Sequence, residues 1–251
     1  MHDTLRPDDE ATLRFVGRVG LAFTIALTII LVIHPFGTTD LYSDGEQFLD
    51  HVSAFWVAIH FAAVAVLFVF PLVIDTWARN LSAPEARAIG RLAALICTLG
   101  MAVGAIHLLG TDTMTFFFFQ DTAAAGGGSE ATTTSVDLLL RFHAATLTTW
   151  VSSFWFAVPA AVGVASLLDP KMPRWFAALA FAAAALQIPA LALTLAERQW
   201  TTLSETILFR GGATLLIAVF FIMTIGMRGG SVHRLIPRGR DHEDMAAGER
   251  V

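Results

Sequence analysis

Apolar residues fall into six long blocks separated by polar stretches, and each block has about the length of a helix that crosses a membrane. A hydrocarbon core of about 30 Å is crossed by about 20 helical residues, and separate spans in lipid must be helices because nothing else satisfies their backbone groups. The pattern predicts an all-α integral membrane bundle of six transmembrane helices. The predicted spans are residues 15–34, 52–74, 92–110, 138–168, 175–196 and 207–227. Residues 1–14 form a predicted N-terminal segment, residues 15–228 the transmembrane domain and residues 229–251 a polar tail.

The composition supports this class. Hydrophobic residues make up 55% of the 251 residues and charged residues only 15%, with a mean hydropathy of +0.65. Soluble domains carry about 25% charged residues, so a soluble enzyme or a nucleic-acid-binding protein is disfavoured. Cys97 is the single cysteine, which precludes an internal disulfide.

The basic residues predict the orientation. Of the 16 lysines and arginines, 13 precede or open the first span, lie between the second and third or between the fourth and fifth, or follow the sixth. The positive-inside rule then places both termini in the cytoplasm. Lys171 is the only lysine, and alanine is abundant. This usage indicates a bacterium rich in G and C, and therefore a bacterial plasma membrane.

Three histidines on consecutive spans form the most specific candidate site. His34 lies 16 residues beyond Arg18, His60 lies 15 before Asp75, and His107 lies 16 beyond Arg91. At about 1.5 Å per residue, each lies roughly 22–24 Å above the cytoplasmic boundary. Imidazoles that converge at this level would bind a transition metal or a haem b. The alternative is three separate interfacial histidines.

The outer end of the fourth span is unusually polar, and polar stripes in spans face the bundle or a wet cavity rather than lipid. Neighbouring span ends add charged groups. An outward-facing polar vestibule is therefore a second candidate site, and a charged headgroup belt is its plain alternative. The vestibule residues are Asp112, Arg141, His143, Thr149, Ser152, Ser153, Glu197 and Arg210.

Glycine and proline predict local packing and shape. Gly100 and Gly104 are four residues apart in the third span, a spacing that permits close helix contact. Pro71, Pro159 and Pro189 lie inside spans and should kink them.

The segment His34-Pro35-Phe36-Gly37, followed by Trp56 and His60 in the next span, resembles a group of bacterial multi-helix membrane proteins. The resemblance covers the first three spans and implies no particular activity. Six-helix cytochromes with two haems pair histidines on their second to fifth helices. Here the fifth span has no histidine, which leaves a single haem as the alternative.

Three functions remain open from the sequence. A redox or metal-binding protein would use the three histidines. A small-solute transporter or channel would use a polar cavity along the fourth span. A non-catalytic membrane subunit would bind another membrane protein or a second copy of the chain. Beyond the lipid bilayer, the sequence predicts no nucleic-acid partner.

Overall fold

The structure is a computed structural model that describes residues 7–33, 54–111, 141–142, 145–197 and 210–233. Within these ranges all regular secondary structure is helical, and six helices are long and apolar enough to cross a membrane. The described residues thus confirm the predicted all-helical class and six helices of the predicted length and apolarity. These candidate spans are Glu10–Ile33, Val57–Arg79, Pro84–Gly110, Ala145–Leu168, Arg174–Ala192 and Arg210–Arg228.

The helical elements divide these spans further. The second span is split in two, and the third and fourth each contain a π-helical segment. The α-helices are α1 (Pro7–Ile33), α3 (Ala54–Leu67), α4 (Phe70–Arg79), α5 (Pro84–Ala105), α8 (Val158–Leu168), α9 (Arg174–Glu197) and α10 (Arg210–Arg228). The π-helical segments are η1 (Ile106–Thr111) and η2 (Val151–Ala157).

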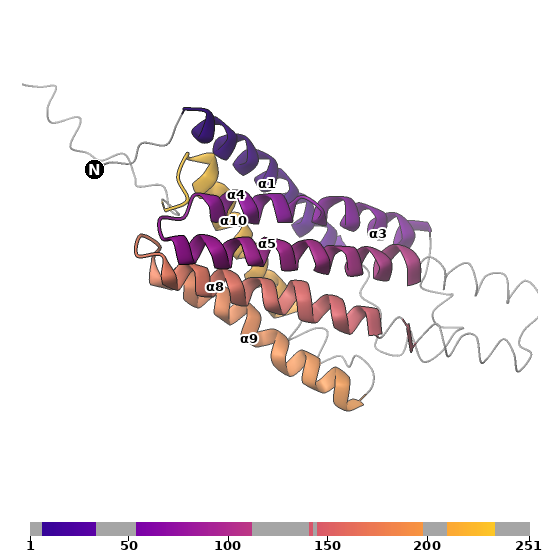
Figure 1. Ribbon diagram of the computed structural model, residues 1–251. Helices are drawn as coiled ribbons and strands as arrows, with labels where there is room; N and C mark the ends of the chain where they lie inside the picture. Colours follow the sequence, from indigo (N-terminus) through magenta and orange to yellow (C-terminus); the bar gives the residue numbers. More distant parts are fainter. Residues whose placement is uncertain (1–6, 34–53, 112–140, 143–144, 198–209, 234–251) are drawn as a thin grey trace, which may run out of the picture.

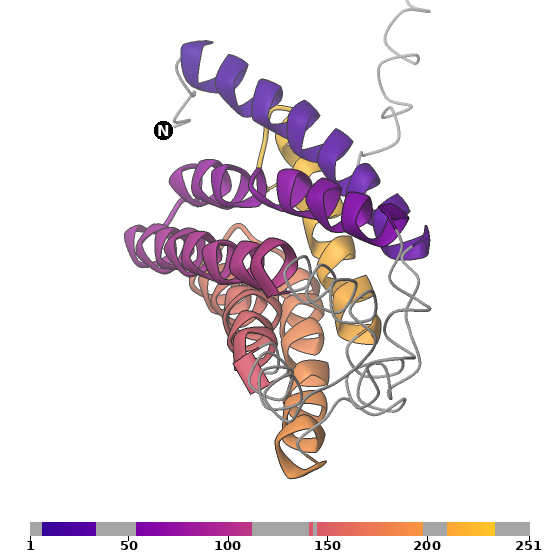
Figure 2. The same ribbon diagram turned by 90° about the vertical axis from the view of Figure 1, so that its right-hand side faces the viewer.

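The six spans form a closed ring in which each packs on the next along the chain, and α10 packs on α1 (Figures 1 and 2). Residues 80–83, 169–173 and 229–233 gather at one end of the bundle, which we call the short-loop end (Figure 1). The start of α1 lies at this end too, because Glu10 and Arg14 are next to Gly230. The short connections at residues 80–83 and 169–173 explain why the second span packs on the third and the fourth on the fifth, because consecutive elements usually lie side by side.

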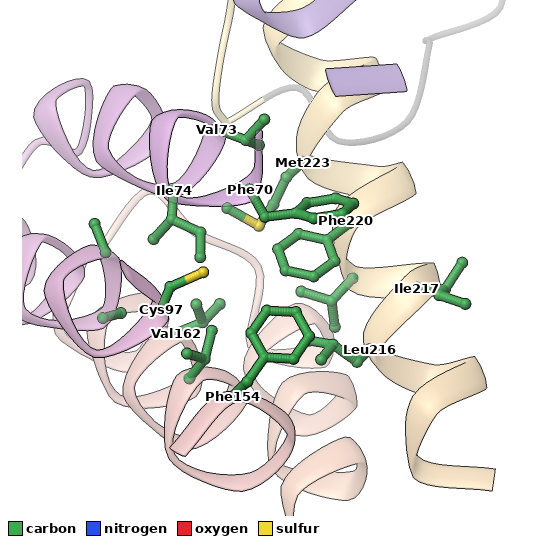
Figure 3. Packing of buried hydrophobic residues seen from close by; sticks show 14 of the residues in the cluster. Phe70, Val73, Ile74, Cys97, Phe154, Val162, Leu216, Ile217, Phe220 and Met223 are labelled. Atoms are coloured by element: carbon green, nitrogen blue, oxygen red, sulfur yellow. The ribbon is translucent and has the colours of Figure 1, made fainter. Parts of the chain in front are cut away.

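Aromatic and aliphatic side chains from opposite sides of the ring fill its centre (Figure 3). The ring centroids of Phe70 on α4 and Phe220 on α10 are 4.2 Å apart, and Phe154 in η2 stacks 6.4 Å from Phe220. Cys97 on α5 is buried in the same cluster.

The outer faces of the helices are also apolar. More than half of the surface of several large hydrophobic side chains is exposed, which is not typical of a soluble monomer of this size. Such exposure is compatible with a multi-pass membrane protein. These side chains are Phe15, Ile29, Val32, Phe61, Phe68, Leu99 and Ile188.

The contact between α1 and α10 depends on glycine. A Cβ added at Gly17 would overlap the backbone nitrogen of Arg228 and lie 2.7 Å from the carbonyl carbon of Met227. A Cβ at Gly20 would lie 2.7 Å from the side chains of Thr224 and Val73. The two helices can therefore approach to backbone contact only because these positions lack side chains.

The three prolines differ in their effect. Before Pro71 the helix is interrupted at Phe68 and Val69, and Pro71 occupies the first turn of α4, where its missing N–H costs little. Pro159 occupies the first turn of α8, directly after η2. Pro189 lies inside α9, which continues through it.

Asp169 joins the loops at the short-loop end. Its Oδ2 accepts a hydrogen bond from the backbone N–H of Ser82 at 2.5 Å, and its Oδ1 accepts one from the Ser82 hydroxyl, also at 2.5 Å. The N–H of Lys171 donates to Oδ1 at 2.9 Å, and Nε2 of His233 lies 3.4 Å from Oδ2. One buried carboxylate thus connects the loops after α4, α8 and α10.

The chain reaches Asp169 from α10 through a Schellman motif. Gly230 has φ of 80°, the N–H of Gly230 donates to Met227 O, and the N–H of Ser231 donates to Gly226 O. Burial alone raises the pKa of Asp169, but the hydrogen bonds from Ser82, Lys171 and His233 outweigh it and lower the pKa below its usual value of 3.8.

Candidate functional site

His107 lies in the π-helical segment η1, near the end of the bundle opposite the short loops. Only 4% of its surface is exposed. Its Nδ1 lies 3.1 Å from the hydroxyl of Thr146, and its ring centroid lies 5.7 Å from that of Trp150. Thr146 and Trp150 are one turn apart at the start of the fourth span, so one face of this span contacts the imidazole.

The surroundings of the Thr146 hydroxyl favour one tautomer of a neutral His107. The hydroxyl has one proton and lies 3.0 Å from the carbonyl oxygen of Phe142, to which it can donate. When it donates there, it acts towards His107 as an acceptor. This arrangement favours the tautomer in which Nδ1 carries the hydrogen and Nε2 the lone pair.

His60 is the second buried histidine in this half of the bundle, with 2% of its surface exposed. It lies on α3, which packs against η1, the segment that holds His107. His34 directly follows α1 and lies outside the described residues. Within the described ranges, no three His, Cys, Asp or Glu side chains form a group that could hold a metal ion.

A buried donor lies next to His107. Among the described residues, no acceptor lies within hydrogen-bond distance of Trp150 Nε1, although the side chain is buried. Gly104 makes room for the indole, because a Cβ there would lie 2.5 Å from Nε1. A Cβ at Gly100 would lie 2.9 Å from Ser153 Oγ. The glycine pair of the third span therefore faces the fourth span, and the close helix contact that its spacing predicts is present.

The fourth span changes to π-helix directly after Trp150, and the sequence explains the change. Pro159 has no N–H to donate to the carbonyl of Trp155, so the regular pattern cannot continue across this position. Instead the N–H of Val158 donates to Ser153 O, five residues back. Serine and threonine hydroxyls that donate to carbonyls one turn back add to the local distortion. Single π turns of this kind are frequent at functional sites.

The predicted vestibule is only partly described. Thr149, Ser152 and Ser153 donate their hydroxyl protons within their own helix, to the carbonyls of Ala145, Thr148 and Thr149 at 2.8 Å in each case. Their hydroxyls can therefore face a cavity only as acceptors.

The charged vestibule residues lie at helix ends. Arg141 is exposed in the short helical piece 141–142, and Arg210 is half-buried at the start of α10. Glu197 is the last residue of α9, and its side chain lies outside the description. Asp112 and His143 lie outside the described residues.

Two residues of the site did not stand out in the sequence as site residues. Thr146 is one of several hydroxyl residues in the fourth span, and Trp150 is typical of interfacial anchoring. Their closeness to His107 follows from the packing of the third span on the fourth. The signal available in the sequence was Gly104, which leaves space for a large side chain three residues before His107.

The comparisons with known proteins add no relative from which a role could be transferred. No protein-family model, curated protein or solved structure matches the chain, so any functional conclusion depends on the residues themselves.

Proposed function

We propose that this chain is a multi-pass protein of a bacterial plasma membrane that binds a transition metal or a single haem through buried histidines in its outer half. The observation that carries the proposal is the orientation of His107. Its Nδ1 lies 3.1 Å from the Thr146 hydroxyl, and this contact favours the tautomer whose electron pair is on Nε2. Histidines that bind metals commonly have this arrangement, in which a second partner fixes the tautomer and the ring.

Three further features support the same site. His60 is buried on the adjacent α3, and His34 directly follows α1, which also packs on α3. The buried N–H of Trp150 is a donor next to the imidazole for a bound group. The π-helical segment that contains His107 is the kind of distortion found at functional sites. The hydroxyls of the fourth span donate within their own helix, so they support transport less well.

The proposal predicts that the purified full-length protein carries metal or haem. Elemental analysis and an absorbance spectrum of protein in detergent should show about one equivalent. We expect His60→Ala and His107→Ala each to lose it. Thr146→Val should weaken metal affinity by about 10–100-fold, because the imidazole loses the acceptor that orients it. Thr146→Ser should keep most of the affinity.

His233→Ala is the matched control, because this histidine lies at the short-loop end and should not affect the bound group. Absence of both metal and haem from protein made in metal- and haem-replete cells would contradict the proposal. So would equal metal content in the wild type and both histidine variants.

The proposed orientation places the short-loop end in the cytoplasm. A cysteine at Glu85, which is exposed in the first turn of α5, should not react with an impermeant thiol reagent added to intact cells. Cysteines at Asp44 and Gly127, in the predicted outer loops, should react. Cys97 is buried and should give little background. Labelling of Glu85→Cys in intact cells would reverse the assignment.

A further inference from the structure

A cavity of about 490 Å³ opens on the outer face of the bundle between α4 and α5, towards the short-loop end. The residues that line it come from two helices. They are Pro71 and Asp75 of α4 and Arg91, Leu92, Ala94, Leu95 and Thr98 of α5. A cavity that combines charged and apolar lining on an otherwise apolar surface suits an amphipathic ligand.

The charged groups in and beside the cavity carry a positive excess. The Asp75 carboxylate lies 2.6 Å from the Arg79 guanidinium and 3.8 Å from Nε of Arg91. Two arginines and one carboxylate leave one net positive charge. The two arginine side chains are 65% and 66% exposed, so their donors are accessible from outside the protein.

The neighbouring Arg87 is not among the lining residues and instead binds loop carbonyls. Its guanidinium donates to the carbonyl oxygens of Leu81 and Ser82 at 2.8 and 2.9 Å, so it stabilises the loop between α4 and α5. Arg91 therefore lines the cavity, and Arg79 adjoins it through its ion pair with the lining residue Asp75.

The apolar part continues from the charges towards the middle of the bundle. Leu92, Leu95 and Leu99 follow one another along α5 at spacings of three and four residues, and all are exposed. Asp75 lies four residues before the end of α4, and Arg91 seven residues after the start of α5. The charges thus lie roughly 6–10 Å from the helix ends, near the level where headgroups meet hydrocarbon.

We propose that this cavity binds an anionic phospholipid, with its phosphate at Arg79 and Arg91 and an acyl chain along the leucines of α5. A phosphodiester carries one negative charge, which complements the net charge of Asp75, Arg79 and Arg91 together. Basic pockets between spans on the cytoplasmic side are typical binding places for anionic headgroups. The proposal requires a membrane-embedded chain but does not depend on the histidine site.

The test is a titration of the full-length protein in detergent with phosphatidylglycerol, and separately with phosphatidylcholine of the same acyl chains, followed by native mass spectrometry. We expect phosphatidylglycerol to bind at least about fivefold more tightly. Arg91→Gln and Arg79→Gln should each weaken its binding about fivefold, as expected for one basic group near a headgroup. Thr98→Phe should also weaken binding, because it fills the cavity and leaves all three charges in place.

Arg18→Gln is the matched control, because Arg18 is exposed near the same end of the bundle, on α1, and does not line the cavity. Equal binding of the two lipids would overturn the proposal, and so would an equal loss in Arg18→Gln. Displacement of the lipid by millimolar inorganic phosphate would assign the cavity to a soluble anion instead. If Arg91→Gln fails to fold, the result for Thr98→Phe decides.

Discussion

Gly17→Leu should separate α1 from α10 and prevent the ring of spans from closing. Even Gly17→Ala should lower the free energy of unfolding by about 1–3 kcal/mol, as overpacking of a tight contact does. The added carbon would meet backbone atoms of Met227 and Arg228, which cannot move aside as a flexible side chain can. Thermal unfolding of the purified variants in detergent, followed by size-exclusion chromatography, measures the effect.

The α10 helix offers a matched pair of glycines for comparison. A Cβ at Gly211 would meet only a side-chain carbon of Leu186 at 3.4 Å, whereas one at Gly212 would overlap the buried amide of Gln187. We expect Gly211→Ala to be neutral or slightly stabilising, because alanine favours helix over glycine. Gly212→Ala should be destabilising. Equal free energies of unfolding for Gly17→Ala and Gly211→Ala would contradict the close contact of α1 and α10.

Asp169→Ala should have a similarly large effect, about 3 kcal/mol of unfolding free energy. Hydrogen bonds to a charged acceptor contribute about 1.5–3 kcal/mol each, and the variant leaves the donors of Ser82 and Lys171 without their acceptor. Asp169→Asn should be milder, because the amide keeps one acceptor oxygen. His233→Ala is the control and should cost about 1 kcal/mol or less, because its contact is longer.

The Asp169 contribution should also depend on pH in a defined direction. The pKa of Asp169 is lower in the folded protein than its usual value of 3.8, so the folded state favours the carboxylate. The stabilisation is then fully present above pH 3.8 and is lost as the pH falls through the lower, folded-state pKa. The difference in Tm between wild type and Asp169→Ala should be constant from pH 7 to 5 and shrink below pH 4. A difference that grew on acidification would contradict this assignment.

The six long apolar helices could be predicted because a bilayer imposes a length and a composition on any helix that crosses it. The exact helix starts could not be predicted in the same way. Helix α1 begins at Pro7 and α5 at Pro84, several residues before the apolar blocks that start at 15 and 92. Hydropathy marks where lipid begins, whereas a helix begins where its backbone hydrogen bonds begin, and proline is well suited to that first turn.

Contacts between distant parts of the chain were harder to predict from the sequence. Asp169, two residues before Lys171, has the sequence pattern of a solvated loop. It is nevertheless buried, because Ser82 and His233 from two other loops contact it. His107 contacts Thr146, 39 residues away in the sequence. The sequence could not single out Thr146, because several neighbouring residues also carry a hydroxyl. The spacing of Gly100 and Gly104 correctly predicted a close helix contact, but it did not identify the fourth span as the partner.

The pairing of α1 with α10 has a consequence for how the protein is made. Helix α1 is the first of the six to leave the ribosome, but the helix that covers its Gly17 face is the last. Until then, among the described elements, α1 packs mainly on α3 and α4, and its glycine surface is uncovered. A synthesis intermediate that ends before Arg210 should therefore be recognised by the cell as unfinished and be degraded faster than the complete chain.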